Sequence, residues 1–559
     1  MRRIPLLVVC SFLFGCYSLL TPTQAQNRPF ILPVAAPASA STWLFGQPYG
    51  NTIGAYLRGA DWYDAGQRLH FGIDLSMPCG TPILAIGAGD VLFVDDLGFG
   101  SGPHNVLIRH ADVGVISLYG HLLDRPSVQA GQFVEQGAVI GYSGDPDITC
   151  DSRPHLHLEI RSMDYFVAYN PADYIDANWH TLSLIGQFRY PAFQQNLDHA
   201  RQWMSVDDQP QVAFGGRALN DYAATYPDWS AGSPPANPPP EREALTAIDG
   251  AWTGRRLTID GCCTNAWWHP TEPNQLFVID GNENQRAAVF QWDTQSGALV
   301  NLIGQAPPPA ESPDGTYTVT RSGDVFRIER KSDLFAWDVN TGGAFPALST
   351  DNTRLLWVTQ GQVIAPGQNE PVNEVWISDA HGADARMIAA EAGLNAQWLD
   401  ESRFLLSRRV GVTTTLGVYE TETGNGYVLG AWDRLRGLTI SPGGDRLMFY
   451  LFAQADSAQS GVYTIETVSG AAAVQQDWFG AWRWRDSSSV FYIPFDPSTD
   501  QQIIRWRDLI SGDDHTVTEA PIAIADGDWS VSADGQQIAY LSLFDRTIWV
   551  LESPDPAQT

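Results

Sequence analysis

The sequence has little positive charge and few long apolar runs. It contains 33 Lys and Arg residues against 63 Asp and Glu, for a formal net charge of -30, and Lys331 is its one lysine. A surface this acidic disfavours nucleic acids and anionic membranes as partners. After the N-terminal segment, no run of residues is long and apolar enough to span a membrane. The motif H-E-x-x-H is also absent, so no helical glutamate supplies a catalytic base.

The N-terminus has the features of an export signal. Two arginines follow the first methionine, an apolar run comes next, and Thr23-Gln24-Ala25 offers a small-residue cleavage site. We therefore predict that residues 1–25 are a secretory signal peptide and that the protein is exported to the medium, the cell envelope or the periplasm. The alternative is a lipoprotein signal that ends at Cys16, although Phe14 fits poorly in such a site.

The chain of 559 residues exceeds one ordinary hydrophobic core, so at least two domains are expected. Residues 26–41 are rich in Pro, Ala and Ser and predict a flexible leader. Short β-like segments separated by Gly, Pro and Asp turns fill residues 42–175 and predict an antiparallel β domain. Residues 176–229 show no clear pattern. The Pro-rich run at 230–243 predicts a semi-rigid linker.

Residues 244–559 repeat one unit: a strand with an aromatic residue, an acidic residue and a turn that ends in glycine. Clear copies are Val289–Gly297, Leu334–Gly342 and Ile503–Gly512. The period of about 40 to 45 residues matches one four-stranded propeller blade, and about seven copies predict a seven-bladed β-propeller, with six or eight blades as alternatives. The repeats resemble those of WD-repeat and TolB-like propellers. The predicted fold class of the whole chain is all-β.

Two short motifs far apart in the sequence predict the halves of one metal site. One is H-F-G-I-D, from His70 to Asp74, and the other is P-H-L-H-L-E-I-R, which contains His155, His157 and Glu159. Side chains alternate faces along a strand, so the polar residues of each motif share a face. Two imidazoles and a carboxylate directed at one point make an open site of the catalytic zinc type. Zinc suits this small mixed set of donors better than other metals.

Four cysteines remain after removal of the signal, an even number that suits an oxidising compartment. Cys79 follows the first motif and Cys150 precedes the second, which favours a disulfide between them; the alternative is two small buried hydrophobic residues. Cys262 and Cys263 are adjacent, and a ring between neighbours is strained, so their pairing stays open.

The stretch from about residue 45 to residue 161 resembles the lysostaphin/LytM-type zinc metallopeptidases, which cleave peptide cross-links in bacterial cell walls. The matching motifs occur in family order: H-F-G-I-D-L, C-G-T-P-I-L-A-I-G-A-G-D-V, Y-G-H-L, V-E-Q-G-A-V-I-G-Y-S-G and P-H-L-H-L-E-I-R. The loop before the last motif is more acidic than is usual in the family, and this difference bears on the choice of substrate rather than on the metal.

The resemblance implies a role for each of five residues. His70, Asp74 and His157 would be the zinc ligands. His121 and His155 would be the catalytic histidines, which move protons and steady the developing oxyanion. An imidazole with a pKa of about 6.5 suits proton transfer near neutral pH. Zinc is the one cofactor that the resemblance implies.

We therefore expect an exported zinc metalloendopeptidase that hydrolyses peptide bonds in peptidoglycan, with a propeller that binds substrate or a protein partner. The alternative is a non-catalytic protein that binds the cell wall and recruits or activates other wall hydrolases, since some members of the family have lost metal ligands. All five site residues are retained in this sequence, which favours the enzyme.

Overall fold

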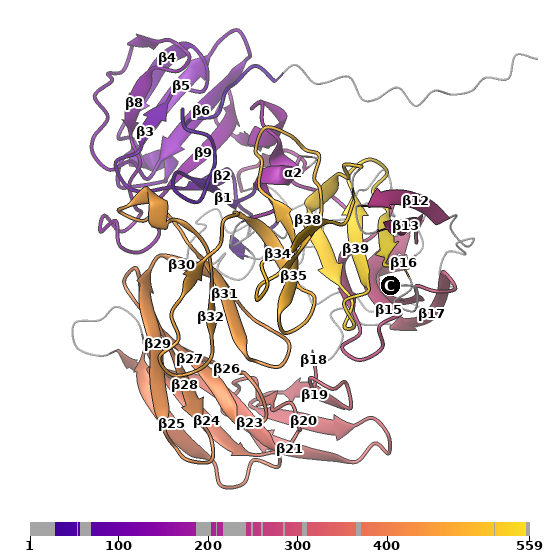
Figure 1. The fold of residues 1–559 in the computed structure, drawn as a ribbon. Helices are drawn as coiled ribbons and strands as arrows, with labels where there is room; N and C mark the ends of the chain where they lie inside the picture. Colours follow the sequence, from indigo (N-terminus) through magenta and orange to yellow (C-terminus); the bar gives the residue numbers. More distant parts are fainter. Residues whose placement is uncertain are drawn as a thin grey trace, which may run out of the picture.

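The computed structural model describes residues 28–52, 54–55, 69–185, 203–207, 209–215, 242–247, 250–258, 261–282, 285–303, 310–364, 371–518 and 520–554. The described chain is nearly all β, as predicted, and forms a sheet domain followed by a propeller (Figure 1). The predicted signal peptide and most of the predicted Pro-rich linker lie outside these residues. No helix within the described ranges has the length and the hydrophobicity that crossing a bilayer needs.

The N-terminal domain is built on a nine-stranded antiparallel sheet. Its main path runs β1 (Leu44–Gln47), β2 (Ile73–Ser76), β9 (His155–Ser162), β6 (Val115–Gly120), β5 (Val106–His110), β4 (Gly89–Val94) and β7 (Phe133–Val134). Beside β9 lie β10 (Val167–Tyr169) and β11 (Val212–Ala213), and a separate pair is formed by β3 (Pro82–Leu84) and β8 (Val139–Tyr142). The helical turns here are η1 (Leu97–Phe99), η2 (Pro171–Asp173) and α2 (Trp179–Leu182).

The alternation of β9 separates the core from the functional face. Leu156, Leu158 and Ile160 are fully buried in the hydrophobic core of the domain. The intervening residues His155 and His157 line a cavity on the other face of the strand. Because the side-chain period of a strand is two residues, burial of the aliphatic set holds the polar set toward the cavity.

Residues 28–41, which the composition predicted to be a flexible leader, lie against the sheet domain. Phe30 is 2% exposed and forms a bridge with Ile175. The amide of Ile31 donates to the carbonyl of Ile86 at 3.0 Å, and Val34 and Ala38 belong to the same hydrophobic core. The apolar residues spaced between the prolines bury enough surface to hold this segment in place.

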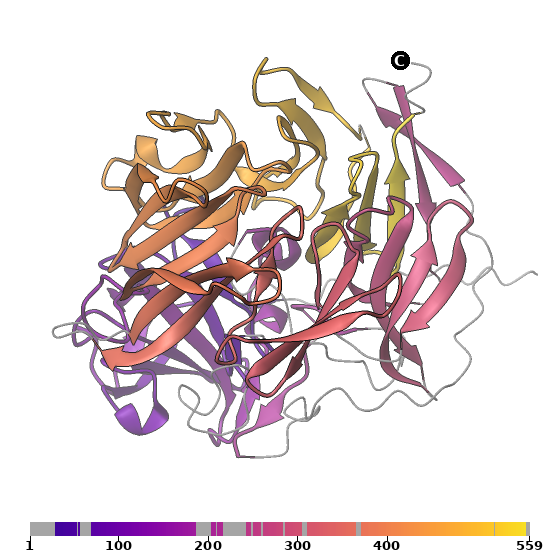
Figure 2. The ribbon, with the colours of Figure 1, turned by 90° about the horizontal axis from the view of Figure 1, so that it is seen from below.

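The second domain is a seven-bladed propeller, whose sheets are set around a common centre (Figure 2). Six of its sheets have four strands each, in chain order. The first contains β14 (Thr264–Trp268), β15 (Gln275–Asn282), β16 (Gln285–Asp293) and β17 (Ala298–Ile303), and the second contains β18 (Ala310–Glu311), β19 (Tyr317–Ser322), β20 (Val325–Arg330) and β21 (Ala336–Asn340). The third contains β22 (Ala347–Leu348), β23 (Arg354–Ile364), β24 (Pro371–Asp379) and β25 (Arg386–Ala392), and the fourth contains β26 (Leu394–Trp398), β27 (Arg403–Val410), β28 (Thr413–Glu420) and β29 (Gly426–Asp433). The fifth contains β30 (Leu435–Ile440), β31 (Arg446–Leu451), β32 (Gly461–Glu466) and β33 (Val474–Gln475), with the helical turn η3 (Ser457–Gln459) before β32, and the sixth contains β34 (Gly480–Trp484), β35 (Ser489–Pro494), β36 (Arg505–Asp508) and β37 (Asp514–Thr516).

The seventh sheet closes the ring. It contains β12 (Arg242–Ala247), β13 (Gly250–Arg256), β40 (Ile548–Glu552), β39 (Gln537–Ser542) and β38 (Ile524–Val531). In this sheet β13, from the start of the domain, pairs with β40 from its end. Pairing the first strands with the last one leaves no open edge between them, which is how a propeller removes the seam between its ends.

The two domains are joined by polar and apolar contacts around α2. The hydroxyl of Thr181 donates to the carbonyl of Thr499 at 2.6 Å, and Leu184 packs in the propeller core. The Nε2 atom of His180 lies 3.1 Å from Asp207 Oδ2, and its Nδ1 lies 3.4 Å from Asp526 Oδ1. Burial lowers the pKa of His180, but the two carboxylates outweigh it and raise the pKa to about 9. Charge pairing therefore helps to hold the propeller on the sheet domain.

Candidate metal centre

The candidate site is assembled by β9 together with its neighbours β2 and β6. Asp74 on β2 and His157 on β9 are paired directly across the antiparallel ladder. On the other side of β9, Gly120 at the end of β6 is paired with the same histidine, and His121 follows it. Three motifs that are far apart in the sequence thus meet on adjacent strands.

Gly72 lets the chain that carries His70 approach β9. A Cβ atom at residue 72 would lie 2.4 Å from the carbonyl oxygen of Leu158 and 2.9 Å from the Glu159 side chain. Any larger residue would therefore push the first motif away from β9.

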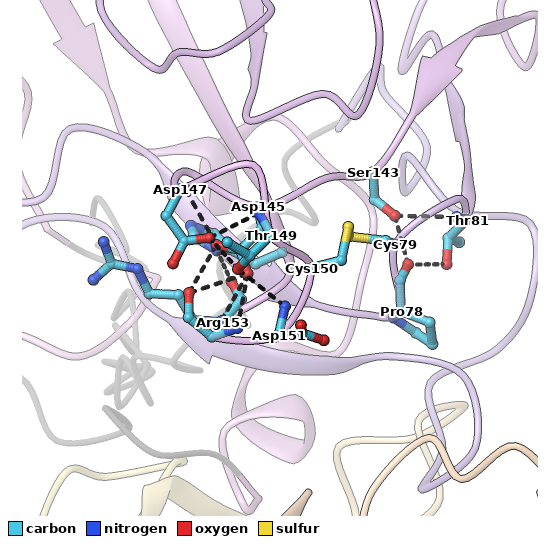
Figure 3. The surroundings of a disulfide bond; sticks show 12 residues. Pro78, Cys79, Thr81, Ser143, Asp145, Asp147, Thr149, Cys150, Asp151 and Arg153 are labelled. Atoms are coloured by element: carbon cyan, nitrogen blue, oxygen red, sulfur yellow. Dashed lines mark hydrogen bonds between the residues drawn. A yellow bond between two sulfur atoms is a disulfide. The ribbon is translucent and has the colours of Figure 1, made fainter. Parts of the chain in front are cut away.

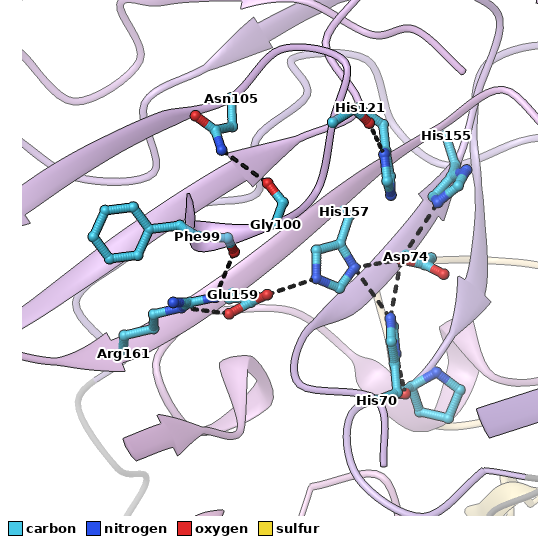
Figure 4. Close-up of polar contacts among 12 residues, drawn as sticks. His70, Asp74, Phe99, Gly100, Asn105, His121, His155, His157, Glu159 and Arg161 are labelled. Carbon is cyan, nitrogen blue, oxygen red and sulfur yellow. Dashed lines mark hydrogen bonds and ion pairs between the residues drawn. The ribbon is translucent and has the colours of Figure 1, made fainter. Parts of the chain in front are cut away.

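Three donor atoms converge, as Figure 4 shows. His70 Nε2 lies 3.1 Å from Asp74 Oδ1, and His157 Nδ1 lies 2.9 Å from the same oxygen. The two ring nitrogens are 3.1 Å apart. In the described part of the chain, this His-Asp-His group is the one whose donor atoms lie close enough to hold a metal ion. Two imidazole nitrogens and one carboxylate oxygen are donors that zinc accepts, so the residues fit this metal.

The other ring nitrogen of each of these histidines has an acceptor. His70 Nδ1 donates to the carbonyl of Pro48 at 2.8 Å, which leaves Nε2 with its lone pair. His157 Nε2 donates to Glu159 Oε1 at 3.0 Å, so Nδ1 is the atom that would face a metal; in the metal-free form Nδ1 carries a proton and donates to Asp74 Oδ1. Hydrogen bonds of this kind set the tautomer and orient the ring for metal binding.

Glu159 links His157 to Arg161. Its second oxygen accepts from Arg161 Nε at 2.6 Å, and Arg161 stacks on Phe214, with 4.5 Å from the guanidinium carbon to the ring centroid. Burial raises the pKa of Glu159, but Arg161 and His157 outweigh it and lower the pKa to about 2. Glu159 therefore stays ionised and holds His157.

Asp74 is also held as a carboxylate. Burial raises its pKa, but His70, His155 and His157 surround it and keep the pKa well below the usual range. In the metal-free form, burial lowers the pKa of His157, while the hydrogen bonds that His157 donates to Asp74 and Glu159 outweigh that effect and raise the pKa to about 9. In the metal-free form the ionised Asp74 therefore pairs with the protonated His157, and a metal ion would replace that proton.

His121 and His155 form a second pair beside the donor group. Their ring centroids are 4.7 Å apart, and His155 Nε2 lies 3.7 Å from Asp74 Oδ1. His121 Nδ1 donates to the carbonyl of Gly102, and His155 Nδ1 donates to that of Arg153 at 2.7 Å. The Nε2 atom of each ring therefore carries the lone pair.

Both histidines of this pair are neutral near neutral pH. Burial lowers the pKa of His121 to about 3, with help from the neighbouring histidines His155 and His157. Burial also lowers the pKa of His155. A neutral imidazole with a lone pair on Nε2 can accept a proton there, which is the property that a general base needs.

The model of peptidase family M23 matches residues 68–171, which include all five site residues. The N-terminal domain is a peptidase family M23 domain. The propeller lies outside the matched residues, so the match covers less than half of the chain.

Curated relatives match the same part of the chain. Lysostaphin of Staphylococcus staphylolyticus is 28% identical over 146 residues, which are 26% of this chain and 28% of lysostaphin. The DD-carboxypeptidase/endopeptidase Mpg of Neisseria meningitidis serogroup B is 43% identical over 94 residues, which are 17% of this chain and 20% of Mpg. The uncharacterized lipoprotein YgeR of Escherichia coli is 34% identical over 142 residues, which are 25% of this chain and 49% of YgeR. The chain thus spans less than half the length of each of these relatives.

A disulfide joins the two motifs of the M23 domain at the rim, as one of the two alternatives predicted. Cys79 and Cys150 are bonded across a separation of 71 residues (Figure 3). Nearby, the buried carboxylate of Asp145 accepts from the amides of Ser152 at 3.2 Å and Arg153 at 2.9 Å. Asp145, one of the acidic residues of this loop, therefore helps to hold the conformation of the segment before β9.

The propeller adds the other wall of the cavity at the candidate metal centre. One cavity of about 910 Å³ is lined by His70, Asp74, His121, His155 and His157 from the M23 domain and by residues of the propeller. Its propeller lining consists of Arg409, Val412, Arg434, Leu435, Arg436 and Phe452. Sequence reasoning missed this wall, because no local motif signals which propeller loop will face another domain.

The two remaining cysteines are also bonded. Cys262 and Cys263 form a disulfide between neighbours, a pairing that the sequence left open. Both side chains are buried in the propeller, in a core cluster that includes Leu257 and Trp268. This bond lies in the propeller core and takes no part in the cavity lining.

Proposed function

We propose that this protein is an exported, zinc-dependent endopeptidase that cleaves peptide bonds in peptidoglycan cross-links. The observation that carries the proposal is the convergence of His70 Nε2, Asp74 Oδ1 and His157 Nδ1 within hydrogen-bonding distance of one another. The names of two relatives support the choice of reaction, since one is lysostaphin and another is a DD-carboxypeptidase/endopeptidase. That the substrate is peptidoglycan and that the cleaved bond lies in a cross-link are both part of this proposal.

In this proposal, His70, Asp74 and His157 hold the metal. Zinc, when bound in such a site, lowers the pKa of a water molecule and polarises a carbonyl group. The hydrogen bonds from the rings to Pro48 and Glu159 keep the donor atoms in position without a large reorganisation.

His155 and His121 handle protons in the proposed mechanism. Each is neutral, with its Nδ1–H engaged by a backbone carbonyl and its Nε2 free to accept a proton. One imidazole takes the proton of the attacking water and, as an imidazolium, delivers it to the leaving amine. The other accepts a hydrogen bond from the attacking water at its Nε2 and so helps to orient it.

Export is part of the same proposal. The basic N-terminus with its apolar run supports it, and so do the disulfides, which persist in oxidising compartments. The word lipoprotein in the name of YgeR is compatible with a location in the cell envelope. The propeller would hold substrate or a partner at the catalytic domain.

The test is digestion of purified sacculi by the mature protein, with released fragments identified by mass spectrometry. Parallel samples contain a chelator or the Asp74→Ala variant. Zinc-dependent fragments that both treatments abolish are the expected result, and they name the bond. Protein that holds zinc and releases no fragment from sacculi or stem peptides contradicts the proposed activity. A wild-type protein that binds no zinc favours the alternative, a non-catalytic wall-binding protein.

A further inference from the structure

The catalytic cavity has the opposite charge character from the rest of the protein. The chain has a formal net charge of -30, yet the cavity is lined by five arginines, namely Arg153, Arg161, Arg409, Arg434 and Arg436. Three carboxylates line the same cavity, those of Asp74, Glu159 and Asp164. A cleft with local positive charge in an acidic protein concentrates anionic ligands at that place.

The carboxylates of the cavity are already engaged. Asp74 accepts from His157, and Glu159 accepts from Arg161. Asp164, at the exposed rim, accepts from the hydroxyl of Ser162 at 2.5 Å. None of these carboxylates forms an ion pair with an arginine of the propeller, within the residues that the structure describes.

The three propeller arginines come from the ends of two neighbouring blades. Arg409 lies near the end of β27, while Arg434 and Arg436 lie at the connection from β29 to β30. Figure 1 shows the start of β30 on the side of the propeller that faces the M23 domain. All three side chains line the same cavity. Burial lowers the pKa of Arg436, Tyr450 opposes this shift, and the charges of Arg409 and Arg434 add to the lowering.

Contacts hold these arginines in place without neutralising them. Arg409 Nη2 donates to the carbonyl of Ser152 in the M23 domain at 2.8 Å. Arg434 Nη1 donates to the carbonyl of Ala453 at 2.9 Å, while its buried Nε has no acceptor. The guanidinium carbon of Arg436 lies 4.5 Å from the ring centroid of Phe452, which is itself buried. Guanidinium groups that are held in place without a carboxylate partner are suited to bind an anion.

We propose that Arg409, Arg434 and Arg436 form a carboxylate-binding subsite of the catalytic cavity, so that the substrates are peptides with a free carboxylate near the scissile bond. This inference rests on the proposed function. It deepens that function, because it distinguishes acidic stem peptides from uncharged polyglycine bridges. The propeller then takes part in the choice of substrate instead of acting only as an anchor.

The chemistry of the subsite favours a carboxylate on a peptide. The planar fork of arginine matches a carboxylate with two parallel hydrogen bonds. The cavity of about 910 Å³ is open to both the metal donors and the arginines, and it lies within the size range of pockets that hold ligands of a few residues. The apolar side chains of Val412, Leu435 and Phe452 line the same cavity, and apolar walls strengthen such a pair by excluding water.

The test compares peptides that differ only in charge. The probes are the fluorescently labelled stem peptide L-Ala-γ-D-Glu-L-Lys-D-Ala-D-Ala, its analogue with every carboxyl group amidated, and pentaglycine amide. Binding to the full-length protein with the His121→Ala substitution is measured by fluorescence anisotropy, so that cleavage does not interfere. We expect the free acid to bind about tenfold or more tightly than either uncharged probe. Equal affinities for the acid and its amide would overturn the subsite.

Variants then assign the preference to the arginines. In the same background, Arg436→Gln and Arg434→Gln should each weaken binding of the acid toward that of the amide and leave the amide unchanged. Arg436→Lys should restore part of the preference. Arg408→Gln is the matched control, because Arg408 is a neighbour on β27 that pairs with Glu391 and does not line the cavity. If one variant fails to fold, the other variant and the comparison of probes still decide the question.

Two further outcomes separate this inference from its alternatives. A preference for the acid that disappears when zinc is chelated but survives both Gln substitutions would place the carboxylate on the metal and overturn the subsite. Cleavage of acid and amide peptides with equal kcat/KM would overturn the subsite and leave the endopeptidase standing. Preferential binding of the acid without cleavage by the wild-type protein would support the subsite and contradict the proposed hydrolysis.

Discussion

The two ends of the catalytic cavity are built in opposite ways. At the M23 end, each imidazole has one nitrogen anchored by an acceptor and the other turned to the cavity, and the carboxylates are held ionised. At the propeller end, Arg409, Arg434 and Arg436 have no ion pair with any described residue. The M23 end holds the candidate metal donors, and the propeller end holds the proposed carboxylate-binding subsite. The comparison shows that two domains of different architecture can complete one polarised site.

The two disulfides differ in a similar way. The bond between Cys79 and Cys150 closes a separation of 71 residues in the M23 domain. The bond between Cys262 and Cys263 closes a separation of 1 residue in the propeller. The M23 domain uses its bond to restrain a long segment, whereas the propeller is ordered by repeated blades and the pairing of β13 with β40.

Removal of one metal donor disrupts the candidate metal site and leaves the propeller arginines unchanged. We expect it to have the largest effect on activity. Asp74→Ala leaves two imidazoles without their shared carboxylate, so we expect loss of bound zinc and a fall in kcat/KM of about 10³-fold or more. Metal content by atomic absorption and peptide cleavage are the measurements. Asp112→Ala, at an exposed turn of the same domain, is the control. Full zinc content and activity in Asp74→Ala would refute the assignment of this ligand.

Removal of each disulfide tests whether the two domains depend on their disulfides to different degrees. Loop closure predicts that Cys79→Ala/Cys150→Ala costs about 4 kcal/mol of folding free energy, because the unfolded chain gains the freedom of a long loop. Cys262→Ala/Cys263→Ala should cost far less, since it frees a ring of neighbours. Differential scanning calorimetry of both variants is the measurement. Equal shifts of the unfolding temperature would show that loop length does not decide the difference.

Weakening the support of His157 tests whether anchoring matters at the M23 end. Glu159→Gln keeps the size of the side chain but removes the charge between His157 and Arg161. We expect zinc affinity to fall about 10- to 100-fold, measured by competition with a chromophoric chelator. The exposed Glu135→Gln serves as the control. An unchanged zinc affinity would mean that the hydrogen bond from His157 to Glu159 does not affect metal binding.

The pH dependence of metal uptake tests the protonation of His157, with the smallest change expected for a single pH unit. His157 in the metal-free protein has a pKa raised to about 9, so it carries a proton at neutral pH that zinc must displace. Zinc affinity should therefore weaken by about tenfold for each pH unit below 9 and level off above it. Glu159→Gln removes one cause of the raised pKa and should move the levelling point to lower pH. An affinity independent of pH between 6 and 8 would contradict the raised pKa.

Much of the fold could be predicted from local patterns. The alternation of aliphatic and polar residues in β9 is visible in the sequence, and the aliphatic set lies in the hydrophobic core while His155 and His157 line the cavity. The repeated aromatic, acidic and glycine unit predicted a seven-bladed propeller, which the structure confirms. The flexible leader expected at 26–41 rested on composition alone, and the described part of it is packed through Phe30 and its neighbours.

The candidate site was only partly accessible from the sequence. The five motif residues could be named, and the structure brings His70, Asp74 and His157 together beside His121 and His155. The acceptors that orient the rings, such as the carbonyls of Pro48 and Gly102, belong to backbone that any residue could supply. No residue type therefore signals them in the sequence.

The sequence by itself determined the strand periods, the blade repeat and the identities of the donor residues, because each of these depends on neighbours along the chain. Only the tertiary structure decided that Arg409 reaches Ser152 across a separation of 257 residues and that propeller arginines line the cavity of the M23 domain. The physical reason is that docking depends on the shapes and charges of two folded surfaces. Such surfaces exist only after distant segments have packed.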